Sequence, residues 1–246
     1  MGDLWIELTT NRVIQQKLPG ATVETLQMVG LSALVVLVVG LPLGLLLRSL
    51  ASDGLTPNRT ASAVLGFVVN TLRALPFIIL AVAVIPVTRA IVGTSLGWEA
   101  AVVPLSLGTI PFFARLVETA VRDVAPGKVE AARVMGSTTP KILGAVLVRE
   151  ALPAIVSGFT VTVIALIGYS AMVGAIGAGG LGFLAITYGF QRFDPTVLYT
   201  SVVVIVVLVT VVQLVGAAVA RRRAHRCARP AATAAPARRP RPGDGP

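Results

Sequence analysis

The sequence predicts an all-α polytopic membrane protein with about five transmembrane helices, and three observations support this fold class. Of the 246 residues, 55% are hydrophobic and 13% are charged, whereas a soluble domain carries roughly 25% charged residues. The apolar residues form long blocks without the one-sided stripe of a surface helix. Each block is also long enough, at ~1.5 Å per residue, to cross a hydrocarbon core of ~30 Å.

Five apolar blocks give the predicted spans, which cover residues 23–47, 61–85, 98–117, 151–176 and 195–220. The third block contains Pro104 and Pro111 and has Arg115 near its end. Proline is tolerated in membrane helices when neighbouring helices satisfy the freed carbonyls, so we keep this block as a span. In the first block, Gly40 and Gly44 form a small-residue motif that is typical of close helix packing.

The distribution of lysine and arginine predicts that the N-terminus lies outside and the C-terminus in the cytoplasm. In this orientation the three inside segments hold two, six and eight of these cations, and the outside segments hold four in all. The predicted organisation is an extracytoplasmic N-terminus (1–21), a membrane domain (22–220) with a long inside loop (122–149), and a basic tail (221–246). Asp3 and Glu7 argue against a cleavable signal, and the Ala, Pro and Arg composition of the tail predicts disorder.

The charge and the rare residue types exclude several function classes. The net charge is +10, but much of it lies in the tail. Membrane topology and anionic lipid explain such a cluster better than nucleic acid does, and no nucleic-acid module accompanies it. Cys227 and His225 are the single cysteine and the single histidine of the chain, so we expect neither a disulfide nor a metal site.

The sequence also lacks the glycine-rich loop that holds nucleotide phosphates. Lys128 follows Gly127, but Val129 stands where a serine or threonine is required. A G-x-G-x-x-G pattern begins at Gly177, but it follows an apolar span rather than a strand, so it does not indicate a dinucleotide site. Its glycines favour tight helix packing or a break. We therefore expect no catalytic residue and no bound cofactor on this chain.

The loop 122–149 is the one sizeable polar connection on the inside. Pro126 and Gly127 interrupt the chain, helix formers follow, and a Gly-Ser-Thr-Thr-Pro turn begins at Gly136. The hydroxyl groups of this turn are expected to cap the next helix, with Pro140 in its first turn. The pattern predicts two short helices at an angle, although an ordinary connecting loop explains it equally well.

Within this loop, Glu130, Ala131 and Ala132, followed after three residues by Gly136, resemble the EAA motif of ABC importer membrane subunits. The resemblance implies a coupling helix that docks into a separate ATP-binding subunit. The small alanine faces permit close packing, and the glycine permits a sharp turn. One departure is that the family's Ile-x-Leu-Pro is replaced by residues 146–149, which end in arginine. Because Pro153 follows later, we expect the bend into the fourth span to come later too.

The resemblance extends beyond the loop. LRALPFIIL (72–80), IPVTRAIVGTSLG (85–97) and GYSAMVGAIGAGGLG (168–182) are similar to the membrane subunit of bacterial methionine ABC importers. The similarity covers residues 22–220 in the same order. It implies a type I ABC importer permease fold in the bacterial inner membrane that conducts methionine. The implied partners are a second copy of the chain, two ATPase subunits that hold ATP and Mg, a substrate-binding lipoprotein and membrane lipid, with no nucleic acid.

Two alternatives remain open: a permease for another small amino acid or peptide, and an ion-driven secondary transporter. The latter predicts carboxylates inside the membrane and an internal repeat. Here the acidic residues lie almost all in loops or at span ends, and no repeat is visible.

Four residues are candidates for the translocation pathway or its gate. Arg73 lies within the second predicted span, where it lines the pathway or snorkels to the cytoplasmic interface. Tyr169, Ser170 and Met172 precede the glycine run of the fourth span. Polar and polarizable side chains there suit a route for a thioether amino acid, with ordinary helix packing as the alternative.

Overall fold

A computed structural model describes residues 11–227, which form helices and turns without a β-strand. Four long helices run along the molecule: α2 (Arg12–Leu50), α6 (Trp98–Arg122), α9 (Val148–Val173) and α11 (Pro195–Cys227). Helix α6 packs between α2 and α9, and α11 packs against α9. The predicted all-helical membrane fold is confirmed, with four helices long and apolar enough to span a bilayer, or five if a bent pair counts as one span.

The bent pair is the second predicted span. Residues 61–85 do not form one helix: α3 (Arg59–Ala74) and α4 (Phe77–Ala83) meet at an angle of 104°, and α5 (Ile85–Val92) follows. The break falls at Pro76, and a proline disfavours the helical conformation at the residue before it. Leu75 accordingly has an extended backbone, with ψ of 134°. The apolar composition was predicted correctly, but the continuous helix was not.

Prolines in the other spans leave their helices intact. Helix α6 continues through Pro104 and Pro111, both of which are buried, and α9 continues through Pro153. The later bend expected near Pro153 is therefore wrong. The irregular turn comes earlier, in the π-helical segment η1 (Ile142–Leu147), where the wider backbone spacing occurs before α9 begins.

Two predicted end segments are partly helical. Helix α2 begins at Arg12, where Asn11 accepts hydrogen bonds from the backbone N–H groups of the first turn. Residues 12–21 therefore belong to a helix that continues into the first span, and residues 1–10 lie outside the described residues. Helix α11 extends to Cys227, so residues 221–227 are helical rather than disordered. The rest of the predicted tail, 228–246, also lies outside the described residues.

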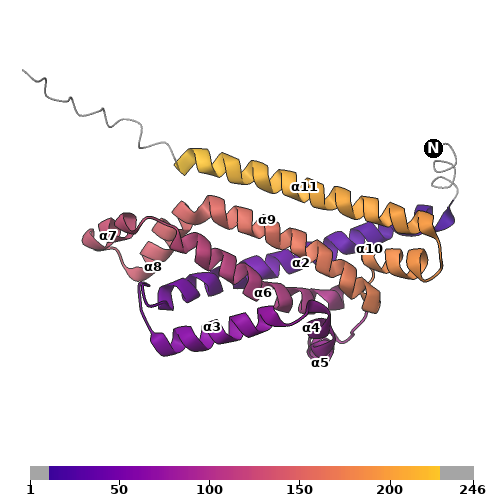
Figure 1. Cartoon of the computed structure of the whole chain (residues 1–246), viewed down its shortest axis with the longest axis horizontal. Coiled ribbons are helices and arrows are strands. Elements are labelled where there is room, and N and C mark those ends of the chain that lie inside the picture. The colour runs from indigo at the N-terminus through magenta and orange to yellow at the C-terminus, as the bar shows by residue number, and fades with distance from the viewer. Residues whose placement is uncertain (1–10, 228–246) are drawn as a thin grey trace, which may run out of the picture.

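The long inside loop contains α7 (Pro126–Val134) and the short α8 (Thr139–Lys141). The first short helix is confirmed, but the second merges through η1 into α9 as one helical stretch. The expected hydroxyl cap is wrong, because Thr138 makes no side-chain cap at the start of α8. In Figure 1, α7 and α8 lie at one end of the bundle, together with the C-terminal end of α11, whereas α2 begins at the opposite end.

Close packing of α2 against α6 depends on the predicted glycine motif. A Cβ atom on Gly44 would lie 2.5 Å from the carbonyl oxygen of Ala114 and 2.6 Å from Cβ of Val117. Phe113 and Val117 are fully buried in the same core. The two helix backbones approach more closely here than any side chain at position 44 would allow.

At the end opposite α7, the chain breaks between η2 (Gly174–Ala178), α10 (Gly180–Phe183) and η3 (Leu184–Phe190). Gly177, Gly179 and Gly180 all adopt positive φ, between 75° and 102°. Such angles strain residues with a side chain, so the glycines allow the break. Gly182 packs on Ala171, where a Cβ atom would come within 2.4 Å of the Ala171 Cα. The expected break and tight packing are both present.

Candidate functional site

The EAA-like residues lie on α7, and they do not all face the same way. Ala132 is 3% exposed and belongs to a core cluster with Ile142 and Leu147 of η1. Glu130 and Ala131 are exposed. Ala132, together with the half-buried Val129, thus attaches the helix to the bundle, while Glu130 and Ala131 lie on the outer face.

The far end of α7 presents apolar side chains to its surroundings. Val134 is 89% exposed and Met135 is 77% exposed. At Gly136 the chain turns with φ of 74°, and the Ser137 N–H donates to the carbonyl oxygen of Ala132. The predicted glycine turn is therefore present, and it places two uncovered hydrophobic residues at the tip of the loop. Exposed apolar residues grouped at one point typically mark a contact with another protein.

An ion pair joins α7 to α9, and a cavity lies between α7 and α2. Lys128 donates to the carboxylate of Glu150, which links α7 to the first turn of α9. A cavity of about 330 Å³ also lies between α7 and the end of α2. Its lining includes Glu130 together with Arg48 and Arg122. The acidic residue of the EAA-like motif thus lies beside the cationic ends of α2 and α6.

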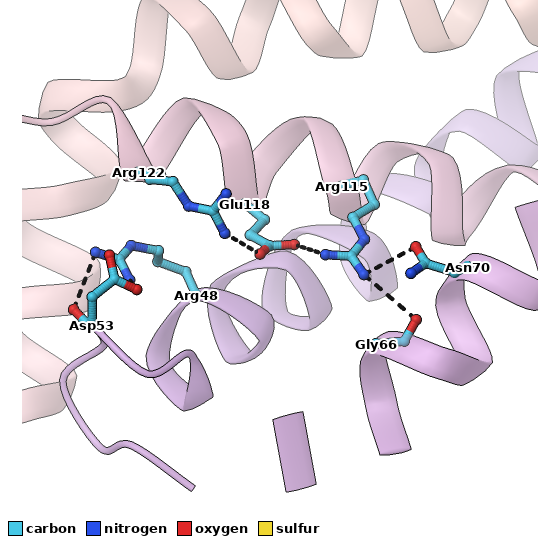
Figure 2. A network of polar contacts seen from close by, with 7 residues as sticks. All are labelled: Arg48, Asp53, Gly66, Asn70, Arg115, Glu118 and Arg122. Atoms are coloured by element: carbon cyan, nitrogen blue, oxygen red, sulfur yellow. Dashed lines mark hydrogen bonds and ion pairs between the residues drawn. The ribbon is translucent and has the colours of Figure 1, made fainter. Parts of the chain in front are cut away.

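A charge network centred on a buried carboxylate lies next to this loop (Figure 2), and the sequence did not indicate it as a site. The Glu118 side chain, on α6, is 6% exposed and lies 2.6 Å from Nη1 of Arg115 and 2.7 Å from Nη2 of Arg122. Arg115 also donates to Oδ1 of Asn70, at 3.0 Å, and thereby joins α6 to α3. The spacing of three and four residues in α6 was the available signal, but the contact with α3 has no local signature.

A separate ion pair closes the turn after α2. Nη1 of Arg48 lies 2.9 Å from Oδ1 of Asp53, and another nitrogen of the same guanidinium donates to the Asp53 carbonyl oxygen. Asp53 is exposed, so this pair orders the turn rather than contributing much stability.

The pathway candidates Arg73 and Tyr169 meet at one cavity midway along the bundle, where Arg73 and Leu75 are exposed. The cavity measures about 260 Å³ and is lined by Leu72, Arg73, Leu75, Phe77, Leu80, Gly108, Phe112 and Tyr169. Tyr169 stacks on Phe77, with ring centroids 4.3 Å apart. The Arg73 guanidinium lies 6.0 Å from the centre of the Phe112 ring. The break between α3 and α4 forms one wall.

Ser170 and Met172 do not line this cavity. Ser170 is 4% exposed, and its hydroxyl donates to the Ile167 carbonyl oxygen at 2.7 Å. Met172 is 47% exposed on another face of the helix end. Adjacent residues of a helix point about 100° apart, so a run of neighbours in the sequence does not share one face.

At the opposite end from α7, α2 binds the start of α10. The backbone N–H of Gly180 donates to Oε2 of Glu24 at 2.7 Å, and that of Leu181 donates to Oγ1 of Thr25 at 2.9 Å. These side chains satisfy N–H groups that a helix start leaves without partners. Within residues 11–227 there is no group of three or more His, Cys, Asp or Glu side chains placed to hold a metal ion.

These features define a class: a multi-pass helical membrane protein with a short exposed helix on a polar loop at one end and a cavity at a helix break within the bundle. Residues 40–225 match the family described as the binding-protein-dependent transport system inner membrane component. The chain belongs to this family, as the loop motif indicated.

The names of similar proteins agree with this assignment. The chain is 48% identical over 206 residues to the probable D-methionine transport system permease protein MetI of Vibrio cholerae, covering 84% of this chain and 92% of the relative. It is 45% identical over 168 residues to the methionine import system permease protein MetP of Bacillus subtilis, covering 68% and 76%.

The fold agrees as well. A chain of the MetNI methionine ABC transporter, solved in inward-facing conformations, matches with a TM-score of 0.85 and 42% identity, covering 87% of this chain and 99% of that chain. The ABC importer permease fold and the inner-membrane location are therefore confirmed. An amino acid ABC transporter that is 18% identical, with a TM-score of 0.63, shares the fold.

Proposed function

We propose that this chain forms the translocation pathway of an ATP-driven importer of methionine. The single structural observation that carries the coupling is the helix α7, which is anchored on one side by Ala132 and exposes Val134 and Met135 at its tip. The substrate follows from the relatives, which are named as permeases for D-methionine or methionine. The chain performs no covalent chemistry in this proposal.

The proposed assembly contains two copies of this chain, two ATPase subunits and a substrate-binding lipoprotein. ATP and Mg reside on the ATPase, and ATP drives the cycle because it binds one conformation of the complex better than the other. The apolar tip of α7 enters the ATPase surface, and Glu130 supplies a charge to that contact or to the ends of α2 and α6. The likeness to the MetNI transporter supports the ATPase partner.

Motion of the ATPase reaches the membrane through the contacts of α7. Ala132 packs on η1, and Lys128 binds Glu150 on α9, so displacement of α7 also displaces the start of α9. Tyr169 on the same helix lines the central cavity with Arg73. In this proposal Met172 faces the pathway in the assembled dimer, and Ser170 fixes the helix beside it.

The coupling role is tested with Glu130→Lys, measured as methionine uptake into cells that lack other methionine importers. We expect uptake to fall to background and less ATPase to co-purify with the chain, because the reversed charge opposes docking. Glu99→Lys is the matched control, since Glu99 is also exposed but lies in the first turn of α6, at the end of that helix that is distant from α7. Normal uptake by Glu130→Lys would contradict the assignment of α7 as the coupling helix.

The substrate and the energy source are tested together in proteoliposomes that contain the chain, the ATPase and the binding protein. We expect methionine to accumulate only when ATP is present on the side of the membrane that carries the ATPase. A proton ionophore should leave the uptake unchanged. Uptake without ATP would favour the ion-driven class, and preference for another amino acid would reject methionine.

A further inference from the structure

We propose that the cavity at the break between α3 and α4 is a carboxylate-binding site for the transported amino acid. Arg73 binds the α-carboxylate, and the rings of Phe77, Phe112 and Tyr169 enclose the side chain. This inference rests on the proposed function, because it takes the cargo to be an apolar amino acid. It adds the residues that hold the cargo within the membrane and the part of the cargo that they recognise.

The cavity lies far from either end of the bundle. Gly108 and Phe112, which line it, are in the middle of α6. Arg73 lies in the last turn of α3, so a helix that rises ~1.5 Å per residue separates it from Arg59 at the inside end. In the predicted topology this separation places the guanidinium away from the cytoplasmic interface, and Arg73 is exposed beside the cavity. The proposal therefore takes its charge to be accommodated at the cavity rather than at that interface.

No acidic residue in the described part of the chain neutralises Arg73. Within residues 11–227 it makes neither an ion pair nor a hydrogen bond, and its recorded contact is with the Phe112 ring. By contrast, Arg115 and Arg122 share the carboxylate of Glu118. A guanidinium presents a planar fork of donors that matches a carboxylate in two parallel hydrogen bonds. Among residues 11–227, Arg73 has no such carboxylate partner.

The remaining walls of the cavity suit an apolar side chain. Phe77 and Tyr169 stack with an interplanar angle of 12°, and Phe112 closes the side next to Arg73. Gly108 allows Phe77 to approach α6, because a Cβ atom at this position would lie 2.9 Å from Cδ2 of Phe77. Thioether sulfur contacts aromatic rings favourably. The volume of about 260 Å³ suits one small amino acid rather than a peptide.

The lining also predicts which group of the amino acid contributes little to binding. It contains one cation and no aspartate or glutamate, so it offers no carboxylate partner for the α-ammonium group. Recognition should depend on the carboxylate and tolerate changes at the nitrogen. Methionine amide should bind poorly, whereas N-acetylmethionine, which keeps the carboxylate, should compete.

The test uses the complex of this chain with its ATPase in nanodiscs, without the binding protein, and a diazirine analogue of methionine as the photoreactive probe. After irradiation, mass spectrometry locates the labelled residues. We expect label on peptides that contain Phe112 and Tyr169, displaced by methionine and N-acetylmethionine but not by methionine amide. Arg73→Gln should lower this labelling about tenfold, as loss of a charged hydrogen bond does, and Arg73→Lys should restore part of it.

Arg89→Gln is the matched control, because Arg89 is exposed on α5 and does not line the cavity. Its labelling should equal that of the parent. The proposal is overturned if Arg73→Gln labels like the parent, if the label lies elsewhere, or if methionine amide competes as well as methionine. If Arg73→Gln fails to assemble, the competition measured on the parent complex decides, since it needs no substitution.

Uptake into proteoliposomes that also contain the binding protein separates this inference from the proposed function. If the parent imports methionine but the cavity is not labelled, the site is wrong and the function stands. If the parent imports no methionine, the proposed function is wrong, and the carboxylate site for methionine is rejected with it.

Discussion

Replacing Glu118 by glutamine should destabilise the protein, because this carboxylate pairs with two arginines at once. Glutamine keeps the size of the side chain and removes its charge. Arg122 is half exposed, so its share is small, about 0–1 kcal/mol. The Arg115 side chain is 25% exposed, and its Nε is buried without a partner. Loss of a fully buried partner costs about 3–5 kcal/mol, and partial exposure reduces this figure.

The two contributions give a loss of about 2–4 kcal/mol for Glu118→Gln. For a chain of this size each kcal/mol lowers Tm by roughly 2–4 °C, so we expect a decrease of roughly 4–16 °C. Tryptophan fluorescence of the purified chain in detergent can follow the melting. Glu99→Gln is the control, since it makes the same change at an exposed position of the same helix. If both variants melt with the parent, the network contributes no stability and the reasoning fails.

Three further changes test other parts of the structure. Gly44→Val should lower the stability by ~1–3 kcal/mol or more through overpacking against α6. Gly30, which has open space around it, is the control: Gly30→Ala should leave the stability unchanged or raise it by ~0.5–1 kcal/mol. Equal melting temperatures of the two variants would contradict the close approach of α2 and α6. Thr25→Val should cost ~1–3 kcal/mol by leaving the buried Leu181 N–H unpaired. The measurement is a lower Tm, and a melting curve equal to that of the unsubstituted protein would refute the prediction. Lys128→Met should lower the methionine imported per ATP hydrolysed in proteoliposomes, and an unchanged ratio would show that the link to α9 is dispensable.

The positions of the spans could be predicted from the sequence, because a bilayer demands long apolar runs whatever the tertiary contacts. The break in the second span could not. Pro76 lies in an apolar run just as Pro104 and Pro153 do, yet the helix stops at Pro76 and continues through the others. Whether a proline breaks a membrane helix depends on how its neighbours satisfy the freed carbonyl, and those neighbours come from distant parts of the chain.

The candidate site divides in the same way. The loop 122–149 has a local motif, so Glu130 and Gly136 could be proposed from the sequence as coupling residues, and the positive φ of Gly136 agrees with its predicted turn. The cavity has no such motif, because Arg73 and Tyr169 come from different spans and meet through packing. Tyr169 and Ser170 are adjacent in the sequence but lie differently: the Ser170 hydroxyl donates to its own helix, whereas Tyr169 lines the cavity.

The arginines on α6 and α3 differ in whether a carboxylate of the same chain pairs with them, and this difference separates structural charges from one that is available to a ligand. Arg115 and Arg122 lie near the end of α6, where both of them pair with Glu118. Arg73 lies opposite the middle of the same helix, and within residues 11–227 no carboxylate pairs with it. A cation within a membrane span is costly unless it snorkels, pairs or faces a polar cavity, and the exposed Arg73, which has no carboxylate partner among residues 11–227, is available to an anion from outside. An amino acid that carries its carboxylate through the cavity supplies that partner during passage and takes it away on release.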